Sequence, residues 1–182
     1  FQNHLDGAIP MQDHTPGGAR FELEYLIGEG GVGQVYKGRD THTGQPVAIK
    51  RLKPELVAHN AEVVKRFNRE GETLRRLNHP NIVKMVTAFE ENQRYYLVME
   101  FVGGGSLQDL LSSNGKLSHE RVIQIALDLA DAITRAHRLG IIHRDLKPAN
   151  VLIDVNDQPR VTDFGLAKRL HHDSELTLSG QV

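Results

Sequence analysis

One loop, His143-Arg144-Asp145-Leu146-Lys147-Pro148-Ala149-Asn150, carries the side chains best suited to chemistry in this sequence. It places a carboxylate at Asp145, a cation two residues later at Lys147 and an amide five residues later at Asn150. Such a loop can orient a hydroxyl nucleophile, neutralise a phosphoryl group and ligate a hard metal ion through oxygen. Asp163, in Asp163-Phe164-Gly165, follows a short predicted hairpin and adds a second oxygen ligand.

A glycine-rich stretch, Gly28-x-Gly30-x-x-Gly33-x-Val35, lies between two predicted strands. Glycines without Cβ atoms allow backbone amides to approach a phosphate closely. A dinucleotide-binding fingerprint would need a helix directly after the glycines and an acidic residue roughly 20 positions later. Here a strand follows instead, and position 48 is Ala48. A glycine-rich hairpin that binds no ligand is the alternative for this motif taken alone.

The predicted strand Val47-Ala48-Ile49-Lys50 supplies a cation near that loop. Strand alternation places Ala48 and Lys50 on one face, which suits a purine over Ala48 and phosphates at Lys50. Glu70 interrupts the apolar stripe of the next predicted helix, and a carboxylate facing a core requires a partner, for which Lys50 is the candidate. The alternatives are that Lys50 ends a solvated strand and that Glu70 reaches water.

Elements that would position these groups follow from periodicity and from capping residues. We expect strands over 21–25, 34–37, 47–50, 82–89 and 95–101, the first three forming an antiparallel meander. Helices are predicted over 60–77, from Ser106, and from Ser118 to Gly140, the last with Val122, Ile125, Ala126, Leu129, Ile133 and Ala136 on one face. Residues 1–20 read as a flexible linker, and the glycines at 103–105 as a linker between two lobes.

Composition excludes several classes of function. The 182 residues carry a formal net charge of −1, so bulk charge indicates neither nucleic acid nor an anionic membrane as a partner. The absence of cysteine removes disulfides, thiolate zinc sites and thiol nucleophiles, and suits a reducing compartment. No apolar stretch approaches the roughly 18 residues of a membrane helix. We therefore expect a cytoplasmic chain with no membrane segment, although a longer protein could be anchored through other residues.

The motifs together, in this order from about Phe21 onward, resemble a eukaryotic-type (Hanks-type) Ser/Thr protein kinase catalytic domain. The resemblance implies an α+β bilobal fold. A small lobe and hinge (21–102) would contain five antiparallel strands and one helix, and 103–182 would begin a mainly helical large lobe that ends in the activation segment. Ala149 is more typical of bacterial members. The family pattern continues beyond Val182, so we expect a C-terminally truncated domain with exposed apolar area on the face that contains Val122.

The resemblance also implies transfer of the ATP γ-phosphoryl group to protein Ser/Thr hydroxyls with Mg²⁺. Asp145 would be the catalytic base, Lys147 would meet the γ-phosphate, and Asn150 and Asp163 would hold Mg²⁺. Lys147 at this position resembles the Ser/Thr-specific pattern. Lys50 would hold the α- and β-phosphates while paired to Glu70. The implied ATP site comprises Ile27, Gly28, Gly30, Gly33, Val35, Ala48, Lys50, Met99, Glu100, Val102 and Leu152. The resemblance also implies an internal spine, a stack of side chains formed by Met85, Leu74, Phe164 and His143.

Two alternatives to an active kinase remain open: a nucleotide-binding pseudokinase or scaffold, and an inactive fragment of an active kinase. The presence of all the expected polar residues argues against a degenerate site. Arg144 and Lys168 could converge on a phosphate in the activation segment, for which Thr177 and Ser179 are the candidate phosphorylation sites. A hydroxyl-bearing loop that is never modified is the alternative.

Overall fold

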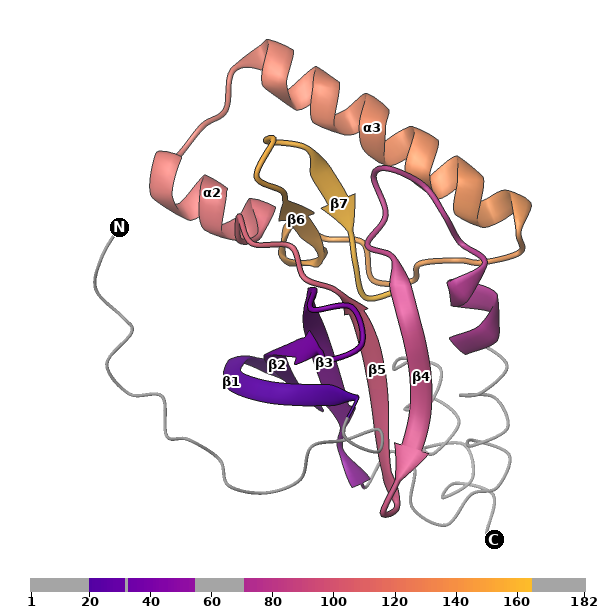
Figure 1. Ribbon diagram of the computed structural model, residues 1–182. Helices are drawn as coiled ribbons and strands as arrows, with labels where there is room; N and C mark the ends of the chain where they lie inside the picture. Colours follow the sequence, from indigo (N-terminus) through magenta and orange to yellow (C-terminus); the bar gives the residue numbers. More distant parts are fainter. Residues whose placement is uncertain (1–19, 32, 55–70, 165–182) are drawn as a thin grey trace, which may run out of the picture. The chain divides into compact units, whose positions relative to one another are not determined.

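The computed structural model describes residues 20–31, 33–54 and 71–164, which form two compact units (Figure 1). The first unit contains the described residues up to Gly71 together with Val86–Phe101. The second contains Glu72–Met85 and the described residues from Val102 onward. The chain therefore passes between the units after Gly71, after Met85 and after Phe101.

A five-stranded sheet with the order β1-β2-β3-β5-β4 forms the first unit (Figure 1). Its strands are β1 (Phe21–Glu29), β2 (Gly33–Asp40), β3 (Pro46–Leu52), β4 (Met85–Glu91) and β5 (Arg94–Glu100). β1 with β2, β2 with β3, and β3 with β5 pair antiparallel, so the predicted meander and small-lobe sheet are confirmed. The prediction that the fourth strand begins at Ile82 is wrong, because Ile82 forms only an isolated bridge with Val161 in the second unit.

One face of this sheet carries the core of the first unit. Val47 and Ile49 alternate inward from β3 and pack with neighbours from other strands. Phe89 stacks between Phe21, at 5.9 Å, and Tyr96, at 5.1 Å between ring centroids. The opposite face carries the intervening residues of β3, Ala48 and Lys50. Strand alternation directs Val47 and Ile49 into the core. It therefore places Ala48 and Lys50, the predicted purine and phosphate contacts, on the opposite face of the sheet.

The second unit contains α2 (Leu107–Asn114), α3 (His119–Arg138), a short 3₁₀ helix (Pro148–Asn150) and the hairpin of β6 (Val151–Ile153) with β7 (Pro159–Val161). Both predicted caps are confirmed: Ser106 forms a capping box with Asp109, and the Ser118 hydroxyl accepts a hydrogen bond from the Arg121 amide. The helix predicted over 60–77 is described only from residue 71, and 71–75 are helical.

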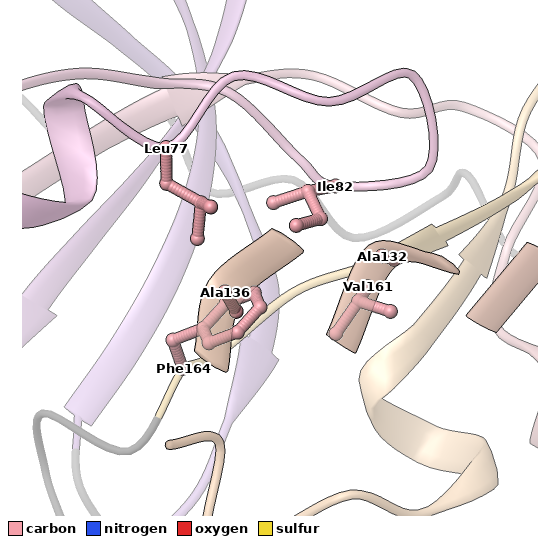
Figure 2. Packing of buried hydrophobic residues seen from close by; sticks show 6 residues of the cluster. All are labelled: Leu77, Ile82, Ala132, Ala136, Val161 and Phe164. Atoms are coloured by element: carbon pink, nitrogen blue, oxygen red, sulfur yellow. The ribbon is translucent and has the colours of Figure 1, made fainter. Parts of the chain in front are cut away.

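The main core of the second unit lies between α3, β7 and residues 74–82 (Figure 2). Its buried members are Leu77, Ile82, Ala132, Ala136, Val161 and Phe164. A second cluster joins α2 and α3 to β6 through Leu107, Ile125, Val151 and Ile153.

The exposed apolar area expected on the face of α3 that contains Val122 is confirmed, because Val122 is 50% exposed and Ala126 is exposed; Ala132, absent from the predicted face, is buried. The elements packed against the helix cover the line through Ile125, Leu129 and Ala136 and leave the neighbouring line uncovered. Ile123 and Leu127 on that uncovered side are also exposed.

The glycines at 103–105, predicted to link two lobes, lie outside helices and strands and make close backbone contacts. A Cβ on Gly104 would lie 2.2 Å from the carbonyl oxygen of Ile153, and Gly105 has a φ of +82°. The amide of Ile153 donates to the Gly105 carbonyl at 2.9 Å. This stretch is packed against β6, where only glycine permits so close an approach.

Candidate active site

Two polar side chains converge on the carboxylate of Asp145. The Asn150 amide nitrogen donates to Asp145 Oδ2 at 3.2 Å and to the Asp145 carbonyl oxygen at 2.8 Å. Lys147 Nζ lies 3.0 Å from the same Oδ2. The 3₁₀ helix Pro148–Asn150 turns the chain so that a residue five positions later reaches back to the carboxylate, and Asn150 is buried. The loop therefore holds a half-buried carboxylate beside a cation, an arrangement that can orient a hydroxyl nucleophile.

His143 fixes this loop against the end of the β6–β7 hairpin. The buried imidazole lies with Nε2 2.8 Å from the Thr162 carbonyl oxygen, and the Asp145 amide lies 3.3 Å from Nδ1. Because a carbonyl only accepts, Nε2 must carry the proton, and Nδ1 is then free to accept from the Asp145 amide. The Thr162 amide also donates to the Asn150 carbonyl at 3.0 Å. Both sides of the loop are thus tied to the residue that precedes Asp163.

Two residues of the candidate site have left-handed backbone conformations, which residues other than glycine rarely adopt. Arg144 has a φ of +65° and Asp163 a φ of +59°. Such conformations cost free energy, so they persist only where the surrounding structure enforces them. They occur most often at functional sites. Arg144 directly precedes Asp145, and Asp163 is itself the candidate second oxygen ligand, so the chain turns sharply at both places.

Phe164 anchors Asp163 in the core of the second unit. Its ring lies 4.7 Å from the His143 ring between centroids, which confirms the predicted contact between these two spine residues. Phe164 belongs to the buried cluster of Figure 2, against which Leu74 also packs. Met85 is buried as well.

The three glycines of the first unit differ in what surrounds them. A Cβ on Gly33 would lie 2.1 Å from the Arg51 carbonyl oxygen, whereas a Cβ on Gly28 or Gly30 would meet nothing within 4 Å. The Gly30 amide donates to the Gly33 carbonyl at 3.0 Å and closes the turn between β1 and β2. Gly33 is therefore required by the pairing of β2 with β3. The packing of the protein gives no steric reason for Gly28 and Gly30, and this suits a loop that approaches a ligand closely.

Lys50 lies in the middle of the sheet face opposite the core and is only 8% exposed. Cross-strand partners share a face, and the register places Lys50 beside Val35 and Leu97. Ala48 lies two residues earlier on that face and pairs with Met99. Four predicted members of the ATP site thus share one face of β2, β3 and β5. The predicted Glu70 partner, like Thr177 and Ser179, lies outside the described residues.

The donor set of the second unit fits a magnesium ion that arrives with a nucleotide. No group of three or more His, Cys, Asp or Glu side chains that could bind a metal occurs within residues 20–31, 33–54 and 71–164. Mg²⁺ is usually held by one or two protein oxygen ligands together with substrate phosphates and water, so no dedicated cage is required. The nitrogen of Asn150 already donates to Asp145, so its amide oxygen is one candidate ligand and Asp163 is the second.

Comparison with known proteins gives the family. The family model for the protein kinase domain matches residues 21–181, so the chain belongs to the protein kinase family. It is 39% identical over 176 residues to a probable serine/threonine-protein kinase of Streptomyces coelicolor and 40% identical over 151 residues to the serine/threonine-protein kinase PrkC of Bacillus subtilis. These matches cover 93% and 83% of this chain but 25% and 23% of the relatives. The chain thus spans about a quarter of the length of these curated relatives.

Solved structures agree with the family assignment. The kinase domain of PknI from Mycobacterium tuberculosis matches with a TM-score of 0.73 and 30% identity, over 82% of this chain and 61% of that one. Rad53 in complex with AMP-PNP matches with a TM-score of 0.72 and 36% identity, over 81% of this chain and 38% of that one. The predicted kinase fold is confirmed. No helix within the described residues is long and apolar enough to cross a membrane.

One part of the candidate site was not predicted from the sequence. The Thr162 carbonyl, which accepts a hydrogen bond from His143 and so aligns the loop that contains Asp145, is a backbone group that any residue type could supply. No residue pattern indicates such an acceptor. The only available signal was the position of Thr162 in the sequence, one residue before Asp163.

Proposed function

We propose that this protein transfers the γ-phosphoryl group of ATP to Ser or Thr hydroxyls of protein substrates in the presence of Mg²⁺. The observation that carries the proposal is the convergence of Asn150 and Lys147 on the Asp145 carboxylate, within a chain of the protein kinase family. The relatives reported above are named serine/threonine kinases. The presence of Lys147 two residues after Asp145 supports the same substrate class.

In the proposed reaction, Asp145 orients the substrate hydroxyl and accepts its proton. Lys147 lies beside that carboxylate and would neutralise charge on the transferred phosphoryl group. Asn150 and Asp163 would hold Mg²⁺, which supplies charge neutralisation at the phosphates when bound. Because phosphoryl transfer demands little covalent chemistry from the protein, catalysis would come mainly from positioning and electrostatics.

The first unit would supply the phosphate contacts and most of the adenine contacts. Lys50 would contact the α- and β-phosphates, with Glu70 as its proposed partner, and Gly28, Gly30 and Gly33 would cover the phosphates. Within this unit, the adenine would lie against Ile27, Val35, Ala48, Met99 and the backbone of Glu100. Val102 and Leu152, which belong to the second unit, remain proposed contacts of the adenine. Support comes from the open space at Gly28 and Gly30 and from the shared face of Ala48 and Lys50. Thr177 and Ser179 remain the proposed phosphorylation sites.

The test compares Asp145→Asn with a matched control, Asp157→Asn, in the full gene product that carries these residues. Asp157 lies in the β6–β7 turn with a φ of +61°, a conformation that asparagine tolerates well. We expect Asp145→Asn to abolish phosphoryl transfer while MgATP affinity changes little, and Asp157→Asn to retain both. Persistent transfer by Asp145→Asn would refute the base assignment. MgATP binding by the unsubstituted protein without any transfer would favour a nucleotide-binding scaffold.

A further inference from the structure

Lys37 lies between two aromatic rings at the end of the first unit. Its Nζ is 5.3 Å from the centroid of the Tyr25 ring and 5.3 Å from the centroid of the Phe101 ring. Glu24 Oε2 lies 3.5 Å from the same nitrogen, and the Lys37 side chain is 26% exposed. A cation within about 6 Å of a ring centroid is attracted by the negative face of that ring. One ammonium therefore links β1, β2 and the residue that follows β5.

The sheet register explains how these three segments meet. Lys37 pairs with Tyr25 of β1 on one side and with Ala48 of β3 on the other. It therefore lies on the same face as Ala48, opposite the aliphatic core. Phe101 directly follows Glu100, the last residue of β5, and is the last residue of the first unit. The ammonium thus holds the ring at the point where the chain leaves this unit.

The surroundings of Lys37 favour its charged form. Hydrogen bonding to the Tyr25 hydroxyl and attraction by Glu24 raise the pKa of Lys37 above its ordinary value. The Lys37 side chain already contacts two aromatic rings and a carboxylate, so its geometry does not support a role as an additional phosphate ligand. Its contacts indicate instead that Lys37 fixes the position of the Phe101 ring and of the backbone next to it.

We propose that Lys37 is a positioning residue for the adenine: it fixes the Phe101 ring and thereby the hinge backbone at Glu100. The proposal rests on the proposed function, in which this backbone meets the adenine edge. Lys37 itself would touch neither the base nor the phosphates. It would set the geometry of the residues that do, through the contacts it makes on β1, β2 and after β5.

The test uses three substitutions. Lys37→Met retains the aliphatic stem and removes the charge, Lys37→Arg retains a cation, and Arg39→Met is the matched control. Arg39 is on the same strand and lies 3.8 Å from Glu24, but its side chain is 58% exposed. Binding is measured by calorimetry for adenosine, MgATP and magnesium tripolyphosphate, and amide hydrogen exchange is followed at residues 99–102.

We expect Lys37→Met to weaken adenosine and MgATP binding by the same factor, about fivefold, which corresponds to about 1 kcal/mol and to the energy of an exposed cation–π contact. Tripolyphosphate affinity should not change. Lys37→Arg should restore adenosine affinity to within about twofold, and Arg39→Met should bind adenosine as the unsubstituted protein does. Hydrogen exchange at Glu100 and Phe101 should become faster in Lys37→Met only.

Unchanged adenosine affinity in Lys37→Met, or equal weakening of tripolyphosphate binding, would overturn the proposal. A lower melting temperature with unchanged adenosine affinity would show a purely structural role and would also overturn it. If the unsubstituted protein bound neither adenosine nor MgATP, the proposed function would fail, and hydrogen exchange would still decide the role of Lys37. Faster exchange at Glu100 and Phe101 would then support positioning of the hinge, and unchanged exchange would contradict it.

Discussion

The substitutions Gly33→Ala and Gly30→Ala should have different effects, although both residues belong to the same glycine-rich stretch. A Cβ on Gly33 would lie 2.1 Å from the Arg51 carbonyl oxygen, 3.0 Å from the Arg51 carbonyl carbon and 3.1 Å from Leu52 Cα. All three atoms are backbone atoms of β3, so no side chain can move aside. A Cβ on Gly30 would meet nothing within 4 Å.

The expected magnitudes follow from these distances. Gly33→Ala must displace β2 from β3 by more than an ångström at the position where Gly33 pairs with Leu52, and overpacking of this kind costs about 1–3 kcal/mol. For a chain of this size, each kcal/mol lowers the melting temperature by about 2–4 °C. Gly30→Ala should change stability by less than about 1 kcal/mol, because alanine fits and restricts the unfolded chain.

Thermal unfolding with and without MgATP measures both effects. Gly33→Ala should melt at a lower temperature in either condition. Gly30→Ala should melt near the unsubstituted protein without nucleotide but gain less stabilisation from MgATP, because its methyl group occupies the space that a phosphate approaches. Equal loss of stability in both variants would refute the reasoning from packing. An unchanged MgATP effect in Gly30→Ala would refute the assignment of this loop to the phosphates.

Three further outcomes follow from single contacts. Asn150→Ala removes both hydrogen bonds to Asp145 and should cost about 1–3 kcal/mol in urea unfolding and slow phosphoryl transfer more than it weakens MgATP binding. Hydrogen bonding from Arg20 holds the pKa of Asp40 below its usual value. The unsubstituted protein should therefore be more stable than Asp40→Asn above about pH 4, and this difference in unfolding free energy should disappear as the pH falls through the lowered pKa of Asp40. Unfolding measured as a function of acid pH can test this. Gly104→Ala should lower the melting temperature, since its Cβ would lie 2.2 Å from a carbonyl oxygen of β6.

Local patterns made the strands of the first unit and the caps of the second predictable. The alternation around Val47 and Ile49 gave the inward face of β3, and Ser106 and Ser118 gave helix starts, because these signals lie within a few residues of the structure they specify. The candidate catalytic loop was predictable for a similar reason. Its three polar residues occupy one short segment, and a 3₁₀ turn at Pro148 brings the last one back to the first.

Features that depend on distant partners were not predictable. Ala132 lies outside the predicted apolar face of α3 yet is buried, because the elements packed on the helix cover that line of residues. No local pattern indicates that Gly104 lies against the carbonyl of Ile153. Lys37 has an unremarkable sequence context, and its role depends on an aromatic ring 64 positions away, at Phe101. Tertiary contacts decide all three.

The most direct test of the central proposal is the transfer of labelled phosphate from ATP, labelled at the γ position, to a mixture of Ser/Thr-containing and Tyr-containing peptides. The full gene product that carries these residues should label Ser and Thr only, and only when Mg²⁺ is present. Asp145→Asn should give no label. Absence of any transfer, label on tyrosine, or equal labelling by Asp145→Asn would contradict the proposal that this loop carries out phosphoryl transfer to Ser/Thr hydroxyls.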